Sequence, residues 1–322
     1  MKKLIFLIII TLVLSVFGYG VYSYLVAPAD PQSTTAKRFV INRGESLASI
    51  AKRLEAEKLI KNRLAFILVV KQLSIEDKIQ AGSFNLSASA SAFDLAKSLT
   101  KGTNDVWVTV VEGLRSEEIA DIFVKNLGID KTEFLSLAKG KEGYLFPDTY
   151  LVPKLSSEAL LVNLMTKTFD QKVTADIKSK IEAQGLSFYQ GLILASLVER
   201  EAKSYNDKVE VASVLLKRLK NDWPLQVDAT VQYALGYNES EKTYWKKDLT
   251  RQDLQIDSPY NTYKNKGLPP TPICNPGLDA IKAVSEADDS TPYWYYLADK
   301  TGKTHFSKTL EEHNQKINLY LR

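Results

Sequence analysis

Hydrophobic residues follow different spacings along the chain, and each spacing predicts a different kind of segment. From Leu4 to Val26 they continue for 23 residues without a charge, which allows a helix of about 34 Å, long enough to cross a bilayer. Further along, apolar residues recur every three or four positions, as in amphipathic helices. Val106–Val111 is a run of β-branched residues with a tryptophan, and it predicts a strand. We expect further helices over 47–57, 63–73, 92–99, 132–138, 157–184, 188–202 and 207–220, and one that begins at residue 116.

The first apolar run predicts a membrane anchor that keeps its N-terminus inside the cell. Lys2 and Lys3 precede the run, and positive residues stay on the cytoplasmic side. Three tyrosines between residues 19 and 24 mark its outer end. A cleaved signal peptide is the alternative, but its apolar core is about 7–15 residues long and a small-residue cleavage site should follow it. We therefore expect residues 1–36 to form a cytoplasmic tip, a single span and a short Pro/Ser/Thr-rich tether.

Residues 37–104 have the pattern of a small α+β module. A strand at Phe39–Ile41 leads through a turn to a helix capped by Ser46, and Asn62 and Ser91 can cap two more. A strand is expected over Ile79–Leu86. The β-α-α-β-α order resembles the LysM-like subdomain that binds cell-wall sugars, with Gly44–Leu47 and Ile50-Ala51 as the matching residues. A generic α+β spacer remains the alternative.

Composition narrows the chemistry that the remaining residues, 105–322, can perform. With 45% hydrophobic residues the chain is not disordered, and a net charge of +4 is too small and dispersed to indicate nucleic-acid binding. One cysteine and two histidines exclude a disulfide framework and leave little room for an imidazole-based zinc centre. We expect no metal or organic cofactor. Any chemistry should rest on carboxylates and hydroxyls.

The helix over 188–202 carries the most informative carboxylates. Ser187 and Gln190 form a capping box at its start, and Glu199 and Glu201 lie near its end. At about 100° per residue the two glutamates point roughly 200° apart, so they cannot form a close pair. Glu199 is expected to form a surface ion pair with Lys203. Glu201 lies on the apolar face, either as a core-edge glutamate paired with an arginine or as a desolvated acid with a raised pKa.

Polar residues downstream suggest a groove opposite this helix. If Leu225–Tyr233 is extended, the side chains of Gln226, Asp228 and Thr230 share one face and could bind sugar hydroxyls. A solvent-facing strand would look the same. The loops 259–263 and 267–272 carry aromatic and amide groups that suit sugar rings and acetamido groups, although turn formation alone explains their prolines. The apolar loop Glu142–Tyr150 must either pack or present its rings to a ligand.

Together these segments resemble a known family, the membrane-anchored endolytic murein transglycosylases or YceG-like proteins. The matching motifs, in chain order, are EGYLFPDTY (142–150), ASLVERE (195–201), LQVDAT (225–230), YNTY (260–263), GLPP (267–270), NPG (275–277) and the stretch 293–314. Val227 and Ala229 stand where the family more often has threonine and proline. The resemblance implies an α+β fold with an N-terminal transmembrane helix, a small LysM-like module over 37–104 and a larger mixed α+β YceG-like catalytic domain over 105–322.

The resemblance also implies roles for individual residues. Glu201, the second glutamate of the E-x-E sequence, would be the catalytic acid. The substrate-binding residues at or near the groove would be Gln226, Asp228, Thr230, Tyr233, Asn261 and Tyr263. We expect His305 and His313 to be structural, because they form no evident triad with a serine.

The implied reaction is non-hydrolytic cleavage of the β-1,4 bond between MurNAc and GlcNAc of peptidoglycan, leaving a 1,6-anhydro-MurNAc end. A lysozyme-like hydrolase that uses Glu201 with Asp228 is one alternative. A non-catalytic peptidoglycan-binding scaffold is another. The implied partners are nascent glycan strands, whose length the enzyme would limit, the cytoplasmic (inner) membrane, and penicillin-binding proteins with the elongation machinery. Nucleic acid is not expected, and the ectodomain would lie in the periplasm or extracytoplasmic space.

Overall fold

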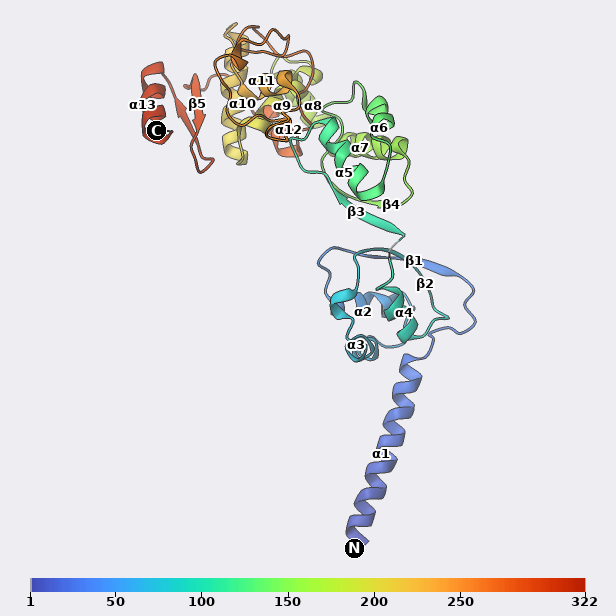
Figure 1. Cartoon of the computed structure of the whole chain (residues 1–322). Coiled ribbons are helices and arrows are strands. Elements are labelled where there is room, and N and C mark those ends of the chain that lie inside the picture. Colours follow the sequence, from blue (N-terminus) through green and yellow to red (C-terminus); the bar gives the residue numbers. More distant parts are fainter. Residues whose placement is uncertain (1, 103, 322) are drawn as a thin grey trace. The chain divides into compact units, whose positions relative to one another are not determined.

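The computed structural model describes residues 2–102 and 104–321, and the chain forms two compact units with mixed α+β structure (Figure 1). The first unit comprises the residues up to Val108 together with Tyr150–Leu155, and the second comprises Thr109–Thr149 and the residues from Ser156 onwards. The predicted α+β class is confirmed. Because β4 returns from the second stretch of chain to the first unit, the division does not fall at one point of the sequence.

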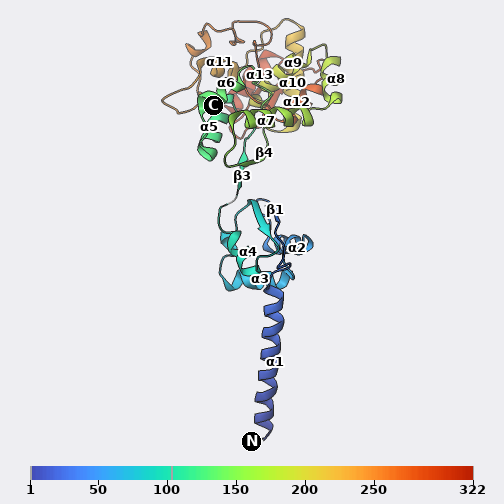
Figure 2. The ribbon, with the colours of Figure 1, turned by 90° about the vertical axis from the view of Figure 1, so that its right-hand side faces the viewer.

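The first unit begins with a long apolar helix, α1 (Lys2–Val26). Its stretch Ile8–Val26 is long and apolar enough to cross a membrane, and within this stretch only Val26 is buried. Its C-terminal end contacts the rest of the unit, where Val26 joins the hydrophobic core and the Tyr22 hydroxyl donates a hydrogen bond to Gln72. The end of α1 lies against α3 in both views (Figures 1 and 2).

A sheet with the strand order β1-β2-β3-β4 and three short helices complete this unit. Strands β1 and β2 are antiparallel, with Phe39 opposite Phe84, and both rings point into the core. Ser46, Asn62 and Ser91 cap the three helices with their side chains, as predicted. The elements are β1 (Ala36–Ile41), α2 (Leu47–Ala56), α3 (Arg63–Gln72), the 3₁₀ turn η1 (Glu76–Lys78), β2 (Gly82–Ser87), α4 (Ala92–Ser98), β3 (Asp105–Thr109) and β4 (Thr149–Pro153).

The second unit is mostly helical. The stretch 157–184, expected to be mostly helical, is divided into two helices: Val173 ends α7, and the Thr174 hydroxyl caps α8 by accepting the amide N–H of Ile177. The elements are α5 (Ser116–Leu127), α6 (Lys131–Ala138), α7 (Glu158–Lys172), α8 (Ala175–Ala183), α9 (Phe188–Glu201), α10 (Tyr205–Lys220), α11 (Asp228–Leu235), η2 (Asp253–Gln255), α12 (Leu278–Ser285), the hairpin β5 (Tyr295–Ala298) and β6 (Thr304–Ser307), and α13 (Leu310–Tyr320).

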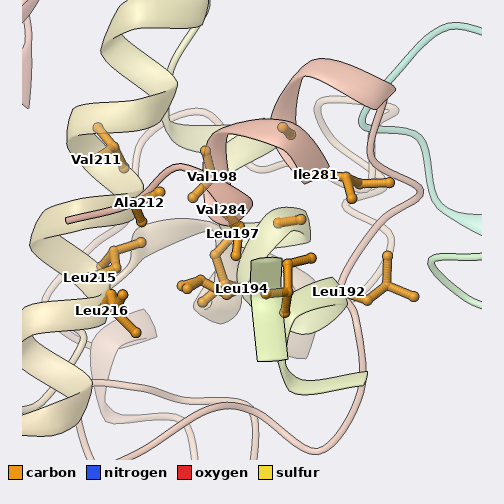
Figure 3. Packing of buried hydrophobic residues seen from close by; sticks show 14 of the residues in the cluster. Leu192, Leu194, Leu197, Val198, Val211, Ala212, Leu215, Leu216, Ile281 and Val284 are labelled. Carbon is orange, nitrogen blue, oxygen red and sulfur yellow. The ribbon is translucent and has the colours of Figure 1, made fainter. Parts of the chain in front are cut away.

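Helix α9 is the centre of this unit. Every residue from Gly191 to Val198 is buried, so the helix is surrounded rather than amphipathic. The predicted capping box between Ser187 and Gln190 starts it. Figure 3 shows its leucines packed between α10 and α12. The position of its last residue, Glu201, is therefore fixed by the packing of the whole core.

The strand expected over 225–233 is wrong. Leu225 and Val227 are buried in extended chain, and the helix α11 begins at Asp228. The Thr230 hydroxyl donates to the carbonyl of Val227 and thereby closes the first turn. Side chains two residues apart consequently do not share a face here. This local hydrogen bond overrides the alternation that favoured a strand.

We predict that Gly191→Ala destabilises the second unit. A Cβ at this position would lie 2.3 Å from Cγ2 of Ile181, a residue of α8 that is fully buried. Relieving the overlap requires α8 and α9 to separate, so the free energy of unfolding should fall by about 1–3 kcal/mol in chemical denaturation. The same substitution in an Ile181→Ala background should cost much less, because the clashing methyl group is gone. Equal costs in both backgrounds would contradict this packing.

Candidate active site

Glu201 lies on the wall of a cleft of about 590 Å³ in the second unit. Of the residues predicted for the groove, Gln226, Asp228 and Tyr263 line the same cleft. Segments far apart in the sequence therefore meet at the end of α9. The other lining residues are Arg200, Arg218, Ala229, Gln232, Tyr295, Tyr296, Leu297, Ala298, Leu310, His313, Ile317 and Leu321.

The surroundings of Glu201 favour its protonated form. Burial raises the pKa of Glu201 to about 7, and the negative charge of Asp228 adds to the increase. The phenol of Tyr296 and two nearby guanidinium groups act in the opposite direction. The carboxyl also lies at the C-terminal end of α9, where the helix dipole disfavours a negative charge. Glu201 can thus hold a proton near neutral pH.

The arginines beside Glu201 are engaged with other groups. The guanidinium of Arg200 lies 3.8 Å from the ring centroid of Trp245 and donates to the carbonyl of Gly113. The guanidinium of Arg218 donates to the carbonyls of Trp294 and Leu225. Of the two interpretations of Glu201, these contacts support the desolvated acid over the glutamate paired with an arginine.

Glu199 lies in a different environment, as the helical angle predicts, but its partner is not the expected one. Its side chain is only 8% exposed and receives hydrogen bonds from Lys208, at 2.6 Å, and from the amide of Gly277. The predicted surface pair with Lys203 is therefore wrong. The partner is Lys208 on α10, which is buried together with Glu199. Glu199 lines a separate cleft and joins α9 to α10 and to the start of α12.

Asp228 and Tyr263 form a polar wall of the cleft that Glu201 also lines. The Tyr263 hydroxyl donates a 2.6 Å hydrogen bond to the carboxylate of Asp228. Asp228 is exposed to the cleft and is the first residue of α11. Gln226 also lines the cleft, with an unusual backbone φ of 52°. A non-glycine residue in this region costs of order 1–3 kcal/mol and often marks a functional position.

Thr230 and Asn261 lie beneath this wall rather than on it. Both are fully buried. Thr230 pairs with the hydroxyl of Thr262 at 2.9 Å. The Asn261 amide donates to two backbone carbonyls, and its oxygen accepts the N–H of Tyr263. Thr230 and Asn261, which were both predicted to bind substrate, thus support Asp228 and Tyr263 from the interior.

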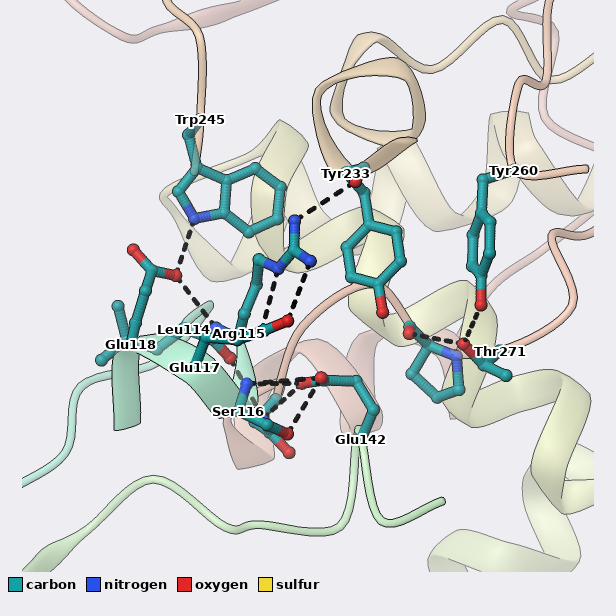
Figure 4. A network of polar contacts seen from close by, with 12 residues as sticks. Leu114, Arg115, Ser116, Glu117, Glu118, Glu142, Tyr233, Trp245, Tyr260 and Thr271 are labelled. Atoms are coloured by element: carbon teal, nitrogen blue, oxygen red, sulfur yellow. Dashed lines mark hydrogen bonds and ion pairs between the residues drawn. The ribbon is translucent and has the colours of Figure 1, made fainter. Parts of the chain in front are cut away.

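Tyr233 lies in a second pocket, of about 380 Å³, which it shares with Glu142, Tyr189 and Tyr260. Figure 4 shows this network, in which the guanidinium of Arg115 lies 4.1 Å from the Tyr233 ring centroid. The family resemblance had implied that Tyr233 binds substrate at or near the groove. Five residues along a helix, it faces away from Asp228. The cleft of Glu201 does not include it.

Glu142 and Asn275 join the loop after α6 to the rest of the unit. Glu142 accepts hydrogen bonds from the amide and hydroxyl of Ser116 (Figure 4). It also accepts one from the Asn275 amide, and burial raises its pKa to about 7. The Asn275 oxygen accepts the N–H groups of Gly143 and Leu145. Leu145 and Phe146 are buried. Of the two possibilities for this apolar loop, the structure supports packing.

Sequence reasoning missed the wall formed by β5 and α13. Tyr296 of β5 lies against the carboxyl of Glu201, and His313 of α13 stacks on Tyr295 with ring centroids 5.3 Å apart. His313 therefore borders the cleft. His305 instead pairs with Asp299 and stacks on Tyr320, as a structural residue would. Arg218 could have been found, since it follows Val211 and Leu215 on the inward face of α10.

Known proteins resemble the chain over almost all of its length. The sequence model of the YceG-like family matches residues 39–319. An endolytic murein transglycosylase of Bacillus subtilis is 33% identical, over 95% of this chain and 90% of the relative. An enzyme of the same name from Streptococcus pneumoniae is 30% identical, over 97% of this chain and 64% of the relative.

A solved structure agrees with these matches. The crystal structure of a yceG-like protein from Listeria monocytogenes has a TM-score of 0.58 and 32% sequence identity, covering 87% of this chain and 99% of the other. The motifs that suggested the resemblance thus lie within a match of family, sequence and fold. The chain belongs to the YceG-like family.

Proposed function

We propose that this protein is a lytic transglycosylase that cleaves the β-1,4 bond between MurNAc and GlcNAc in peptidoglycan. The relatives named endolytic murein transglycosylase support this class of enzyme. The observation that carries the proposal is Glu201, a carboxyl with a pKa raised to about 7 on the wall of an open cleft. A general acid needs a pKa near the working pH and access to its substrate.

In the proposed reaction Glu201 acts first as an acid and then as a base. Its proton passes to the glycosidic oxygen as the bond to the MurNAc anomeric carbon breaks. The resulting carboxylate then removes the proton of the C6 hydroxyl of the same MurNAc, whose oxygen bonds to the anomeric carbon. Both protons are accounted for, and the product ends in 1,6-anhydro-MurNAc. One acid/base suffices because the nucleophile is part of the substrate and is held at a high effective concentration.

The remaining polar groups of the cleft would bind and stabilise the glycan. The carboxylate of Asp228, oriented by Tyr263, is placed to stabilise positive charge that develops on the sugar ring. Gln226 offers an amide to hydroxyl or acetamido groups. Thr230 and Asn261 would act by supporting these residues, and Tyr233 would contribute only through its separate pocket.

We further propose the division of labour along the chain. Residues 1–36 would anchor the protein in the cytoplasmic membrane by α1 with the N-terminus inside. Residues 37–104 would bind glycan as a LysM-like module, and residues 105–322 would perform the cleavage outside the cytoplasm. Beside the membrane, the enzyme would cut nascent strands and limit their length, together with penicillin-binding proteins and the elongation machinery.

Replacing Glu201 with glutamine should abolish cleavage without harming the fold. We expect turnover of uncrosslinked glycan strands to fall by about 10²–10⁴-fold, measured as anhydro-ended fragments by mass spectrometry. At pH 8 the variant should unfold with a free energy about 1–3 kcal/mol higher than the original protein, because the cost of ionising a buried carboxyl is removed. Glu182→Gln, at an exposed position on α8, is the matched control. Unchanged cleavage by the glutamine variant would show that Glu201 is not the acid. Intact glycan binding without cleavage by the original protein would leave only a scaffold role.

Activity should depend on pH through the same carboxyl. The reaction begins with protonated Glu201, so kcat/KM should fall as pH rises through about 7, tenfold per unit at higher pH. Tyr296→Phe removes a group that lowers the pKa of Glu201 and should move this limb to higher pH. A wild-type limb near pH 4.5, the ordinary value of a glutamate, would show that Glu201 does not start the reaction protonated.

Asp228→Asn distinguishes the transglycosylase from a two-carboxylate hydrolase. Removing this negative charge should lower the pKa of Glu201 and move the alkaline limb of kcat/KM to lower pH. The products should still carry anhydro ends, with a reduced rate. Tyr263→Phe, which removes only the hydrogen bond to Asp228, is the milder control. Reducing-end products from the original protein that disappear in Asp228→Asn would identify water as the nucleophile.

A further inference from the structure

Helix α3 is apolar on the side that faces away from its own core. Ala65, Phe66 and two valines are buried against the rest of the first unit. On the other side Leu64 and Leu68, one turn apart, are 62% and 57% exposed. Two large exposed leucines on one face of a short helix form an apolar patch. Such a patch is typical of a surface that contacts a protein partner or a membrane.

The exposed side of α3 is also the side on which α1 ends. The Tyr22 hydroxyl of α1 donates a 3.0 Å hydrogen bond to Gln72 of α3, and Lys61 lies 4.0 Å from the ring centroid of Tyr24. At about 100° per residue, Leu64, Leu68, Lys71 and Gln72 all fall within an arc of roughly 100°. Both views show α3 beside the end of α1 (Figures 1 and 2). Where α1 leaves a bilayer, this arc therefore meets the membrane surface.

The charges on α3 suit an anionic surface. The helix carries Arg63 and Lys71, both exposed, and no acidic residue. Cationic side chains beside apolar ones are the composition of a helix that lies in a membrane interface. The tyrosines of α1 near this point are of the kind that gathers at the same depth, with Tyr24 66% exposed.

We propose that the face formed by Leu64, Leu68, Arg63 and Lys71, the α3 face, inserts into the outer surface of the bilayer that α1 spans and contacts anionic lipid headgroups. The inference rests on the proposed anchoring by α1. Contact at a second point prevents the first unit from turning freely about its anchor. A helix of this kind buries its leucines at the boundary of headgroups and acyl chains, while its cations remain at the phosphates.

The test measures depth in the membrane with the full chain in nanodiscs. Cys274, which is buried, is replaced by alanine, and single cysteines at Leu64, Leu68, Val13 and Leu160 carry a fluorophore. Leu160 on α7 is a 44% exposed leucine of the second unit and is the matched control. Val13, within α1, reports on the anchor itself. Lipids with a nitroxide near the headgroup quench labels at that depth, and lipids with a nitroxide deep in the acyl chain quench labels at the bilayer centre.

We expect the emission of the Leu64 and Leu68 labels to shift to the blue and the shallow nitroxide to quench both. The deep nitroxide should quench the Val13 label. Neither nitroxide should quench the Leu160 label. Replacing Arg63 and Lys71 with glutamine should reduce shallow quenching in phosphatidylglycerol discs and leave it unchanged in phosphatidylcholine discs.

Quenching at Val13 without quenching at Leu64 and Leu68 would overturn the proposed membrane contact of the α3 face, while α1 would remain an anchor. Loss of quenching at all positions would show that α1 does not span. A blue shift of the Leu68 label that appears only with two chains per disc, without quenching by the shallow nitroxide, would identify a second copy as the occupant and refute the lipid contact.

Discussion

The cleft depends on one constraint, the burial of a carboxyl group at the C-terminal end of a helix that is itself buried on every side. Gly191 to Val198 are enclosed by α8, α10 and α12, so α9 cannot shift to carry Glu201 out into water. Burial, the negative end of the helix dipole and the charge of Asp228 all disfavour ionisation of this carboxyl. The core of the unit thus sets the protonation state of a residue on its surface.

Three buried glutamates of this unit differ in what surrounds their carboxyl groups. Glu199, two residues before Glu201, is paired with Lys208 and the amide of Gly277. Glu142 has a raised pKa like Glu201, but Ser116 and Asn275 occupy its oxygens. Glu201 alone combines the raised pKa with a place on the Asp228 cleft. A proton on Glu201 is available to a ligand in the cleft, whereas the carboxyl oxygens of Glu142 are occupied by hydrogen bonds that hold a loop in place.

The sequence predicts local features of the structure well and long-range ones poorly. The capping residues Ser46, Asn62, Ser91 and Ser187 were identifiable because a cap needs only its own helix. The opposite orientation of Glu199 and Glu201 follows from helical geometry alone. The partner of Glu199 did not follow, since Lys208 reaches it only once α10 packs on α9. The strand expected at 225–233 is an exception among the local features, because α11 begins at Asp228, where the Thr230 hydroxyl donates to the carbonyl of Val227 and closes the first turn.

The walls of the cleft come from distant segments, and Arg218 explains how they are held together. Its guanidinium, largely buried in the lining of the cleft, donates to the carbonyls of both Leu225 and Trp294. Leu225 is followed by Gln226 and Asp228, and Trp294 by the two tyrosines of β5. A planar group with several fixed donors can bind two carbonyls in different directions, which the single ammonium of a lysine does less well. Because Arg218 also lowers the pKa of Glu201, the residue that joins both walls also limits how strongly the acid retains its proton. Assembly of the cleft and tuning of its acid therefore depend on the same buried charge.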